Sequence, residues 1–384
     1  MTKTRILTIF GTRPEATKMA PVIKELAKWP DFLETRLCVT AQHREMLDQV
    51  LATFQLRPEY DLNLMKPKQT LSSLSRLILV HLEPVIQDFK PDMVLVHGDT
   101  LTTFMGALLS FYSQIKVGHV EAGLRTYDKM APYPEEMNRQ LTARIADLHF
   151  SPTHANKQNL LAERIPSEHI FLTGNTAIDA IQTTVQPDFI FQTEILNQVV
   201  ADGRRIITIE AHRRENLGQP MQEIVDAIRE LALTRPDMLF VWPLHLNPAV
   251  RDVAKMRLSG LDNVFLLEPL EMLEMHNLMS RSYLVLTDSG GLQEEAPALG
   301  KPVLLLRDVT ERQEAVNAGT VLLIGPHKQA IIDQTNRLLG DHRLYKRMAD
   351  APNPFGDGRA AERIVQALLY YFGHRKEYPE EFLP

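Results

Sequence analysis

Short apolar segments alternate with amphipathic segments along the first part of the chain. The amphipathic segments include APVIKELAKW and LSSLSRLILVHLEPVIQDF, whose apolar positions recur with the period of a helix. The apolar segments are RILTIF, RLCVT, DMVLVHGD, KVGHVEAG, LHFSPT and IFLTGN. Short, almost wholly apolar strands separated by helices are typical of a parallel sheet that helices cover on both faces. The pattern therefore predicts an α/β domain.

The pattern weakens between residues 180 and 204 and then starts again. The second series of apolar segments is RRIITIEA, DMLFVWPL, NVFLLEP, YLVLTDSG, PVLLL and TVLLIG. We therefore predict two Rossmann-like, doubly wound parallel-sheet domains that face a cleft, over residues 1–175 and 176–357. A last helical stretch, at about 358–384, is expected to cross back onto the first domain. Ligands of such sheets bind beyond the carboxyl ends of the strands, so functional residues are expected there.

Composition narrows the class of protein. The 384 residues are 44% hydrophobic and 23% charged, which is typical of globular proteins and favours two domains. The net charge of −6 leaves no basic footprint for nucleic acid. The one cysteine, Cys38, rules out an internal disulfide or a cysteine-rich metal site, and its apolar neighbours predict a buried thiol. Because we find no signal peptide and no apolar run that could span a bilayer, we expect a cytoplasmic protein without a membrane partner.

The stretch FGTRPEATKMAP follows the first predicted strand and contains a single glycine. A dinucleotide-binding turn needs three glycines so that pyrophosphate can approach the backbone, and nicotinamide binding is therefore not expected. Pro14 fits the first turn of a helix and Glu15 fits the positive end of its dipole, which are structural explanations. A cation is unfavourable at that end, so Arg13 and Lys18 predict a nearby anionic ligand.

Acidic residues follow two consecutive predicted strands. Asp99 follows the apolar strand in VLVHGDT, Glu121 follows the strand of VGHVEAGLRT, and Glu135 comes a short loop later in APYPEEMNRQLT. Each has a structural alternative, because Asp99 can cap a helix and Glu135 or Glu136 can serve a helix dipole. Together they are expected to converge at one sheet edge, where mutual repulsion raises the pKa of at least one carboxyl. Such a cluster binds a metal or transfers protons, and we favour proton transfer.

Histidines occur in two different settings. His97 and His119 are at strand-interior positions, where packing is the expected role. His212 and Arg213 directly follow the strand in TIEAHRREN, and His245 follows the next strand in PLHLNP. Runs of charge are usually solvated. This run leaves a buried strand directly, so the alternative is that its side chains point into the cleft.

The segment YLVLTDSGGLQEEAP places a pair of glycines after a strand. Ser289, Gly290 and Gly291 open a helix whose amides and dipole predict a diphosphate site. Glu295 is positioned to bind ribose hydroxyls, and Arg312 after the following strand is a second candidate phosphate contact. The structural alternative is a helix with a serine cap and an acidic first turn.

These motifs together resemble one enzyme family, the non-hydrolysing UDP-N-acetylglucosamine 2-epimerases. The resemblance covers nearly the whole chain, and its motifs occur in the family's order and spacing. The motifs are FGTRPEATKMAP, VTAQHREMLDQV, VHGDT, VGHVEAGLRT, PEEMNRQLT, TGNTAIDA, HRREN, HLNP, TDSGGLQEEAP, GKPVLLLRDVTER and NPFGDG. The resemblance implies a GT-B fold with UDP in the second domain, a homodimer, and no nicotinamide cofactor or metal. It also implies interconversion of UDP-N-acetylglucosamine and UDP-N-acetylmannosamine for surface polysaccharide synthesis.

The resemblance also implies roles for single residues. Catalytic roles fall on Asp99, Glu121, Glu135 and His212, with the three carboxylates as the acid/base set. Substrate contacts fall on Arg13, Lys18, Asp99, Glu121, His212, Ser289, Gly290, Gly291, Glu295 and Arg312. Bacterial members can bind a second UDP-N-acetylglucosamine as activator, and the matching positions are Gln42, Gln69, Glu136, Arg213 and His245.

Three positions depart from the family pattern. Glu210 stands where threonine or serine is usual, while the adjacent Ala211 fits the usual glycine or alanine. Met275 replaces an aromatic residue near the uracil, and Gln313 replaces a proline. The first departure is expected to alter the electrostatics of the cleft, and Met275 is expected to weaken stacking on the base.

The family reaction proceeds by elimination of UDP. UDP leaves C1, the C2 proton is lost to give a glycal-like intermediate, and a proton and UDP then return. The main alternative activity is that of a GT-B glycosyltransferase with a UDP-sugar donor. Further alternatives are a hydrolysing epimerase, a non-catalytic sugar-nucleotide sensor, and an epimerase for a diacetamido uronic acid nucleotide. Incubation with UDP-N-acetylglucosamine alone distinguishes a glycosyltransferase, because only an epimerase forms the manno product.

Overall fold

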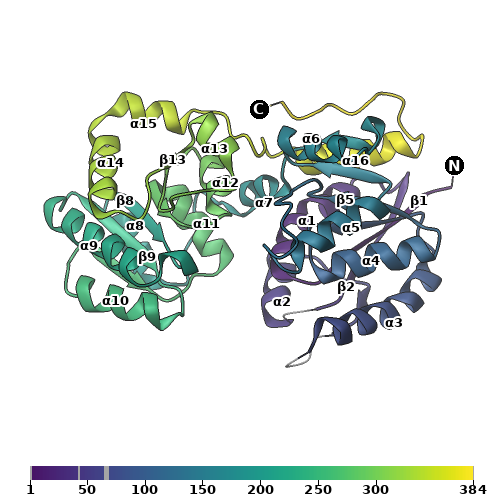
Figure 1. Ribbon diagram of the computed structural model, residues 1–384, viewed down its shortest axis with the longest axis horizontal. Helices are drawn as coiled ribbons and strands as arrows, with labels where there is room; N and C mark the ends of the chain where they lie inside the picture. The colour runs from purple at the N-terminus through teal and green to yellow at the C-terminus, as the bar shows by residue number, and fades with distance from the viewer. Residues whose placement is uncertain (1, 42–43, 65–68, 384) are drawn as a thin grey trace. The chain divides into compact units, whose positions relative to one another are not determined.

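The computed structural model describes residues 2–41, 44–64 and 69–383. The chain forms two compact units, which Figure 1 shows coloured along the sequence. The first unit comprises Met1–Ala180 and Phe355–Leu383, and the second comprises Ile181–Pro354. The division near residue 180 falls inside helix α7 (Thr176–Thr184), a few residues beyond the predicted position.

The first unit contains a parallel sheet. Its strand order within the described residues is β3-β2-β1-β4-β5-β6-β7. The strands are β1 (Thr4–Phe10), β2 (Leu33–Val39), β3 (Tyr60–Asp61), β4 (Met93–His97), β5 (Lys116–Val120), β6 (Leu148–Ser151) and β7 (Ile170–Leu172). Every described pair of neighbouring strands is parallel.

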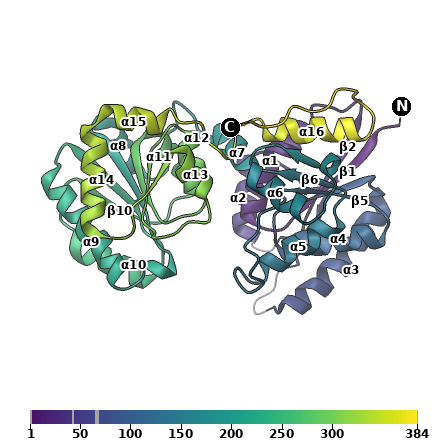
Figure 2. The same cartoon turned by 45° about the horizontal axis from the view of Figure 1, so that its top comes forward.

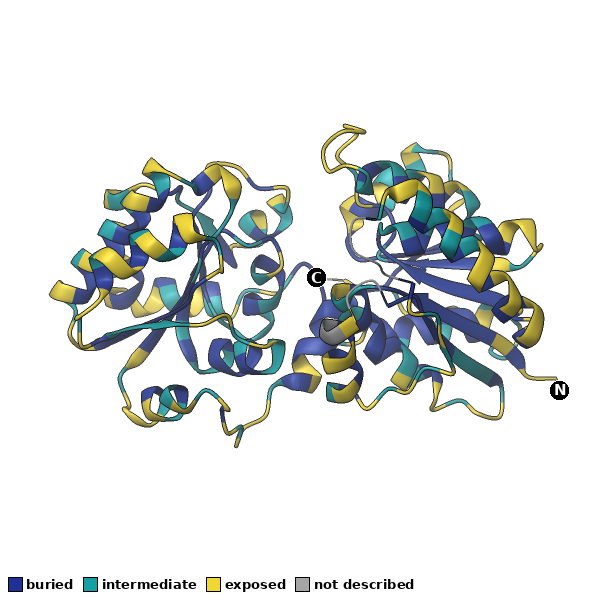
Figure 3. Cartoon of the chain, turned by 90° about the horizontal axis from the view of Figure 1, so that it is seen from below, coloured by how far each residue is buried: buried dark blue, intermediate teal, exposed yellow. Residues whose placement is uncertain are grey.

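Helices cover both faces of this sheet. The remaining helices of the unit are α1 (Arg13–Leu26), α2 (Arg44–Thr53), α3 (Leu71–Phe89), α4 (Leu101–Tyr112), α5 (Glu135–Ile145), α6 (His154–Ala162), the 3-10 helix η1 (Ser167–His169) and α16 (Ala360–Tyr371). Helices α3, α4 and α5 lie side by side, and α16 packs against α1 (Figure 2). Leu7 and Ile9 of β1 are buried in one cluster with Leu82 of α3 and Ala107 of α4. Most residues of strands β1, β4, β5, β6 and β7 are buried (Figure 3).

The second unit repeats this architecture. Its described strand order is β10-β9-β8-β11-β12-β13, and the pairs are again parallel. The strands are β8 (Arg205–Glu210), β9 (Met238–Pro243), β10 (Val264–Leu267), β11 (Ser282–Thr287), β12 (Val303–Leu305) and β13 (Val321–Leu323). The helices are α8 (Glu194–Ala201), η2 (Arg214–Asn216), α9 (Gln219–Thr234), α10 (Pro248–Leu258), α11 (Met272–Arg281), α12 (Leu292–Ala298), α13 (Gln313–Ala318), α14 (Lys328–Gly340) and α15 (His342–Ala349).

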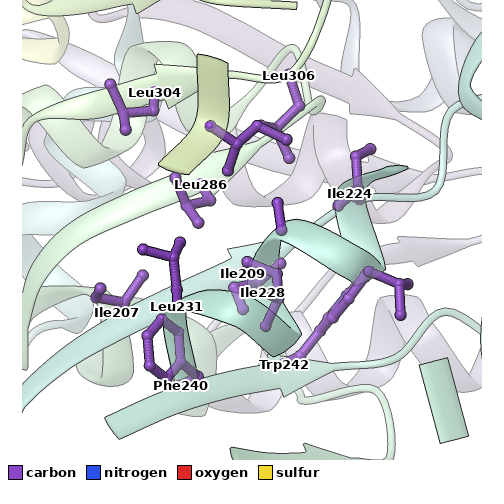
Figure 4. Close-up of a cluster of buried hydrophobic side chains, with 14 of the residues drawn as sticks. Ile207, Ile209, Ile224, Ile228, Leu231, Phe240, Trp242, Leu286, Leu304 and Leu306 are labelled. Carbon is purple, nitrogen blue, oxygen red and sulfur yellow. The ribbon is translucent and has the colours of Figure 1, made fainter. Parts of the chain in front are cut away.

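Alternate residues of the second sheet pack on opposite faces. Ile207 and Ile209 of β8 pack with Trp242 of β9 in one buried cluster (Figure 4). Ile206 packs on the other face with Leu278 of α11. Because successive strand residues point to opposite sides, a strand buried on both faces must be apolar throughout. This is the pattern from which the strands are predicted, and the predicted α/β class with two parallel-sheet domains is confirmed.

Each sheet contains a point where the strand order reverses. In the first unit this point lies between β1 and β4, and in the second it lies between β8 and β11. In open α/β sheets the ligand-binding crevice lies at the carboxyl ends of the strands that flank such a point. The loops after these four strands are therefore the first places to examine.

Two features bear on the expectations from composition. Cys38 of β2 is fully buried, and burial raises the pKa of its thiol to about 12. Across the described residues, no helix combines the length and the apolar character needed to cross a membrane.

Replacing Asp179 by alanine is expected to loosen α16. The Asp179 carboxylate accepts hydrogen bonds from the backbone nitrogens of Ala360 (3.2 Å) and Ala361 (2.8 Å) at the start of that helix. Loss of a helix cap costs about 1 kcal/mol, so hydrogen exchange of the α16 amides should rise about fivefold. Asp341→Ala is the matched control, because Asp341 caps α15 and should affect exchange only there. Unchanged exchange in α16 of Asp179→Ala would contradict this role.

Candidate active site

The segment after β1 is organised by Glu15. Thr12 caps α1, and the buried Glu15 carboxylate accepts hydrogen bonds from the backbone nitrogens of Thr12 (2.8 Å) and Gly11 (3.1 Å). Its second oxygen accepts from the hydroxyls of Thr100 (2.8 Å) and Thr103 (3.2 Å). Burial raises the pKa of Glu15, and these hydrogen bonds oppose the rise. Glu15 therefore joins the start of α1 to the start of α4, which agrees with its structural explanation.

Gly11 has a packing role. A Cβ atom at this position would lie 2.2 Å from Oγ1 of Thr40 and 2.6 Å from Oγ1 of Thr102. These two hydroxyls share a buried hydrogen bond of 2.9 Å. The glycine thus allows the close approach of the segments after β1 and β2 to α4, which explains it without a bound phosphate.

Glu121 follows β5 and forms an ion pair with Lys18 of α1. Asn175 donates a hydrogen bond of 3.0 Å to the same Glu121 oxygen. Burial by itself would raise the pKa of Glu121, but the charges of Lys18 and His97 and the hydrogen bonds of Lys18 and Asn175 together lower it to about 2. Glu121 is therefore ionised at neutral pH. Its carboxylate is an anion that Lys18 contacts within the protein itself.

The two strand histidines differ in their surroundings. The ring Nε2 of His119 is 2.7 Å from the backbone oxygen of Gly98, in agreement with a packing role. His97 is also buried, but its Nε2 lies 3.7 Å from Oε2 of Glu121. Burial lowers the pKa of His97 to about 4, so its ring is neutral at pH 7. Its ring nitrogens have no hydrogen-bond partner among the described residues.

Asp99 follows β4 and pairs with Arg139 of α5, with 2.9 Å between Oδ2 and Nη2. The cap of α4 is Thr100, whose hydroxyl accepts from the backbone nitrogen of Thr103 (3.1 Å). The helix-capping alternative for Asp99 is therefore wrong. Burial raises the pKa of Asp99, Arg139 opposes the rise, and the charges of Glu121 and Glu135 add to it.

The predicted raised pKa thus applies to Asp99, while that of Glu121 is lowered. The reason is that Lys18 lies directly against Glu121 and, together with His97 and Asn175, outweighs the effect of burial. Glu135 begins α5, and its charge acts on Asp99. The first unit therefore brings together Lys18, Asp99, Glu121 and Glu135.

The neighbouring Glu136 has a different environment. Its side chain is fully buried, and its carboxylate accepts hydrogen bonds from the backbone nitrogens of Thr126 (3.0 Å) and Tyr127 (3.1 Å) and from Gln140 (2.7 Å). These contacts give it a role in holding the loop after β5. Among the other activator positions, Gln69 donates to the backbone oxygen of Leu64 (2.9 Å), and Gln42 lies outside the described residues.

In the second unit, the acids Glu210 and Asp288 surround His212. Oε1 of Glu210 lies 2.6 Å from Nδ1 of His212. The Asp288 carboxylate accepts from the backbone nitrogens of His212 (3.0 Å) and Arg213 (2.9 Å) and from Asn216 (2.8 Å). Burial raises the pKa of Asp288, and these donors oppose the rise. The loop after β8 is thereby attached to the end of β11.

The ligand atoms of Glu210, His212 and Asp288 lie within 4.8 Å of one another. Such spacing resembles that of a small metal site, but the donors described above already surround the Asp288 carboxylate. We therefore treat the group as a hydrogen-bonded cluster and not as metal ligands.

Four further predicted residues lie beside this cluster. The ring of His245, from the loop after β9, stacks on the ring of His212 at 4.7 Å with an interplanar angle of 8°. A Cβ atom at Gly290 would lie 2.8 Å from Nη1 of Arg312 and 3.1 Å from Nη2 of Arg213. The predicted positions His212, Arg213, His245, Gly290 and Arg312 are thus neighbours in the second unit.

Helix α12 begins after the glycine pair. Gly291 is its N-cap, so Ser289 is not the cap, and the serine-cap alternative is wrong. The carboxylate of Glu294 accepts from Nε of Arg312 (2.6 Å). Oε1 of Glu295 would lie 3.7 Å from a Cβ atom at Gly291, and its Oε2 lies 3.7 Å from Nε2 of His276.

Some members of both groups are not predicted from the sequence. They are His97, Arg139 and Asn175 around the first-unit acids, and Thr287, Asp288 and Asn216 around His212. Asp288 could have been predicted, because it directly follows β11 and the same position after a strand identifies Asp99. The others are distant in sequence from their partners. Arg13 begins α1, and its backbone oxygen accepts from Thr17 (3.1 Å).

Comparison with known proteins supports one family. The family model for UDP-N-acetylglucosamine 2-epimerase matches residues 24–369. The UDP-N-acetylglucosamine 2-epimerase of Bacillus subtilis is 53% identical over 382 residues, which cover 100% of this chain and 99% of that protein. A crystal structure of UDP-N-acetylglucosamine 2-epimerase is 50% identical with a TM-score of 0.94, and the match covers 100% of both chains.

The similarity extends to a structure with a bound nucleotide sugar. The crystal structure of the Neisseria meningitidis UDP-GlcNAc 2-epimerase bound to UDP-GlcNAc is 51% identical, covers 95% of this chain and 100% of that one, and has a TM-score of 0.82. These matches confirm the resemblance inferred from the motifs. The chain belongs to the UDP-N-acetylglucosamine 2-epimerase family.

Proposed function

We propose that this protein interconverts UDP-N-acetylglucosamine and UDP-N-acetylmannosamine. The observation that carries the proposal is the group of acids after β4 and β5, in which an ionised Glu121 and a partly buried Asp99 of raised pKa lie near Glu135. Two carboxyls whose pKa values are moved apart are suited to different tasks in one reaction. The names of the relatives support the same substrate.

The reaction inverts a carbon whose C–H bond is not activated. Direct removal of the C2 proton would leave an unstabilised carbanion, so bond breaking starts at C1. The C1–O bond breaks with its electron pair leaving on UDP, and the C2 proton passes to a base, which leaves a C1=C2 double bond. Return of a proton to the other face of C2 and re-addition of UDP at C1 complete the inversion.

The two acids differ in their suitability as the base. A base works best when its pKa is close to the working pH. Asp99, whose pKa burial raises, is therefore assigned to the C2 proton. Glu121, whose pKa is about 2, is a weak base, and it is assigned to stabilising the positive charge that develops at C1. Glu135 completes the acid/base set.

The nucleotide is assigned to the second unit. Arg213 and Arg312 lie beside Gly290, where two guanidinium groups can accompany a diphosphate that the backbone approaches closely. His212 adds a third group that can carry positive charge. Ser289, Gly291 and Glu295 are assigned to the same nucleotide, and Arg13 and Lys18 to the substrate in the first unit.

The cellular setting is also a proposal. We infer a cytoplasmic homodimer that supplies surface polysaccharide synthesis and takes a second UDP-N-acetylglucosamine as activator. Arg213 and His245 are the activator positions that lie beside His212. The activator role of Glu136 is indirect, because its carboxylate already holds the loop after β5.

Reaction in deuterated water is expected to place deuterium at C2 of both sugars. The C2 proton is exchanged with solvent at the acid that carries it, so each epimerisation labels that carbon. A proton NMR time course with UDP-N-acetylglucosamine alone should show manno product together with loss of the C2 proton signal. Manno product without label would exclude elimination. Failure to form manno product would instead favour a glycosyltransferase or a nucleotide sensor.

A further inference from the structure

Glu210 is a residue that the family pattern does not predict. It ends β8 and pairs in register with Thr287 at the end of β11, so it lies where the strand order of the second sheet reverses. Its Oε1 is 2.6 Å from Nδ1 of His212, and its Oε2 accepts a hydrogen bond of 2.9 Å from the Thr287 hydroxyl. One carboxylate therefore contacts the loop after β8 and the last residue of β11.

The contacts of Glu210 continue to the glycine pair. The Thr287 hydroxyl that donates to Glu210 accepts from the backbone nitrogen of Ser289 at 2.9 Å. The imidazole of His212 is thus connected through Glu210 and Thr287 to the start of the segment Ser289–Gly291. A side chain that links these groups can fix their relative positions before the nucleotide binds.

The groups around His212 determine which of its forms is stable. They are Glu210 from β8, Asp288 after β11, the adjacent Arg213, and the stacked ring of His245 after β9. The close contact of the Glu210 carboxylate with Nδ1 raises the pKa of His212, burial and Arg213 oppose the rise, and the charges of Glu210 and Asp288 support it. Because the Glu210 carboxylate lies against Nδ1, Nε2 is the ring nitrogen left for a ligand.

We propose that Glu210 is a positioning residue that holds the His212 imidazole through Nδ1 and presents its protonated form to the diphosphate of the nucleotide. This inference rests on one part of the proposed function, namely that His212 contacts the nucleotide. Imidazolium attracts the anionic diphosphate and neutral imidazole does not. The contribution of His212 to UDP affinity is therefore present below the pKa of His212 and is lost as the pH rises through it. With Glu210 in place, that loss occurs at higher pH.

The first test is a titration of His212 without ligand. Two variants remove the carboxylate: Glu210→Gln keeps the size of the side chain, and Glu210→Thr introduces the residue that the family pattern predicts, so it is expected to fold. NMR of the histidine-labelled protein should show the His212 midpoint lower by about one pH unit in both variants. The signal is identified by its absence in His212→Asn. An unchanged midpoint would overturn the proposal.

The second test measures the affinity for UDP by calorimetry as a function of pH. Between the two midpoints, Glu210→Gln should bind UDP about fivefold more weakly than the unmodified protein. Well below both midpoints it should bind at least as tightly, because a negative charge near the diphosphate has been removed. Weakening by the same factor at every pH would indicate a merely structural role and would contradict the proposal.

Two controls separate this inference from the proposed function. Glu230 lies on α9, where it pairs with Lys328, and Glu230→Gln removes the same charge from the same unit. This control should leave the His212 midpoint and the affinity for UDP unchanged. If His212→Asn binds UDP as well as the unmodified protein, the assigned His212 contact is wrong. If His212→Asn weakens binding and Glu210→Gln does not at any pH, the proposal about Glu210 alone is wrong.

Discussion

Glu121→Gln is expected to lower kcat about 1,000-fold while UDP binds within about threefold of its usual affinity. Glutamine has the shape of glutamate and can still accept a hydrogen bond from Asn175. It lacks the negative charge that stabilises the positive charge developing at C1. Loss of one well-placed electrostatic contact to a transition state typically costs two to three orders of magnitude, about 100- to 1,000-fold. Initial rates by NMR and UDP affinity by calorimetry measure the two effects separately.

The matched control for this variant removes another glutamate that pairs with a lysine. Glu25 of α1 contacts the exposed Lys28, and Glu25→Gln should change kcat less than about twofold. The pH dependence offers a second check. Because the pKa of Glu121 is about 2, its charge in the unmodified protein is constant over the neutral range. The loss of kcat in Glu121→Gln should therefore be the same at every pH in that range. A Glu121→Gln variant that keeps normal turnover would contradict the assignment.

The fold follows closely from the sequence because burial on both faces leaves a plain signal. Strand β8 is apolar at Ile206, Ile207 and Ile209, and the structure buries these residues in two clusters on opposite sides. The domain limits are harder to predict. The division near residue 180 lies inside α7, and a continuous helix carries no loop or change of composition that would mark it.

The site is predicted where position along the chain determines position in space. Asp99 and Glu121 follow neighbouring strands, so the rule for carboxyl ends places them at one edge. The partners of these acids cannot be predicted in this way. Lys18 and Glu121 are 103 residues apart, and their contact depends on how α1 packs against the sheet. That contact, together with those of His97 and Asn175, explains why the pKa of Glu121 falls although an isolated group of acids predicts a rise.

Local chemistry also leaves some choices open that only packing decides. Asp99 and Thr100 are both good helix caps, and the sequence offers no reason to prefer the second. The structure makes Thr100 the cap and turns Asp99 toward Arg139. Glu135 and Glu136 are adjacent in the same way, yet only Glu136 is fully buried and holds a loop.

Asp99→Asn is expected to lower kcat about 100- to 10,000-fold with little loss of stability. Asparagine can still accept a hydrogen bond from Arg139 but cannot take the C2 proton, so deuterium uptake at C2 should fall by the same factor as epimerisation. Thr100→Ala should show the opposite result: unfolding easier by about 1 kcal/mol, because α4 loses its cap, and kcat within about threefold. Initial rates by NMR and thermal unfolding of both variants measure these effects. If Asp99→Asn lost stability and kept its turnover, Asp99 would be structural and the proton would have to pass to Glu121 or Glu135.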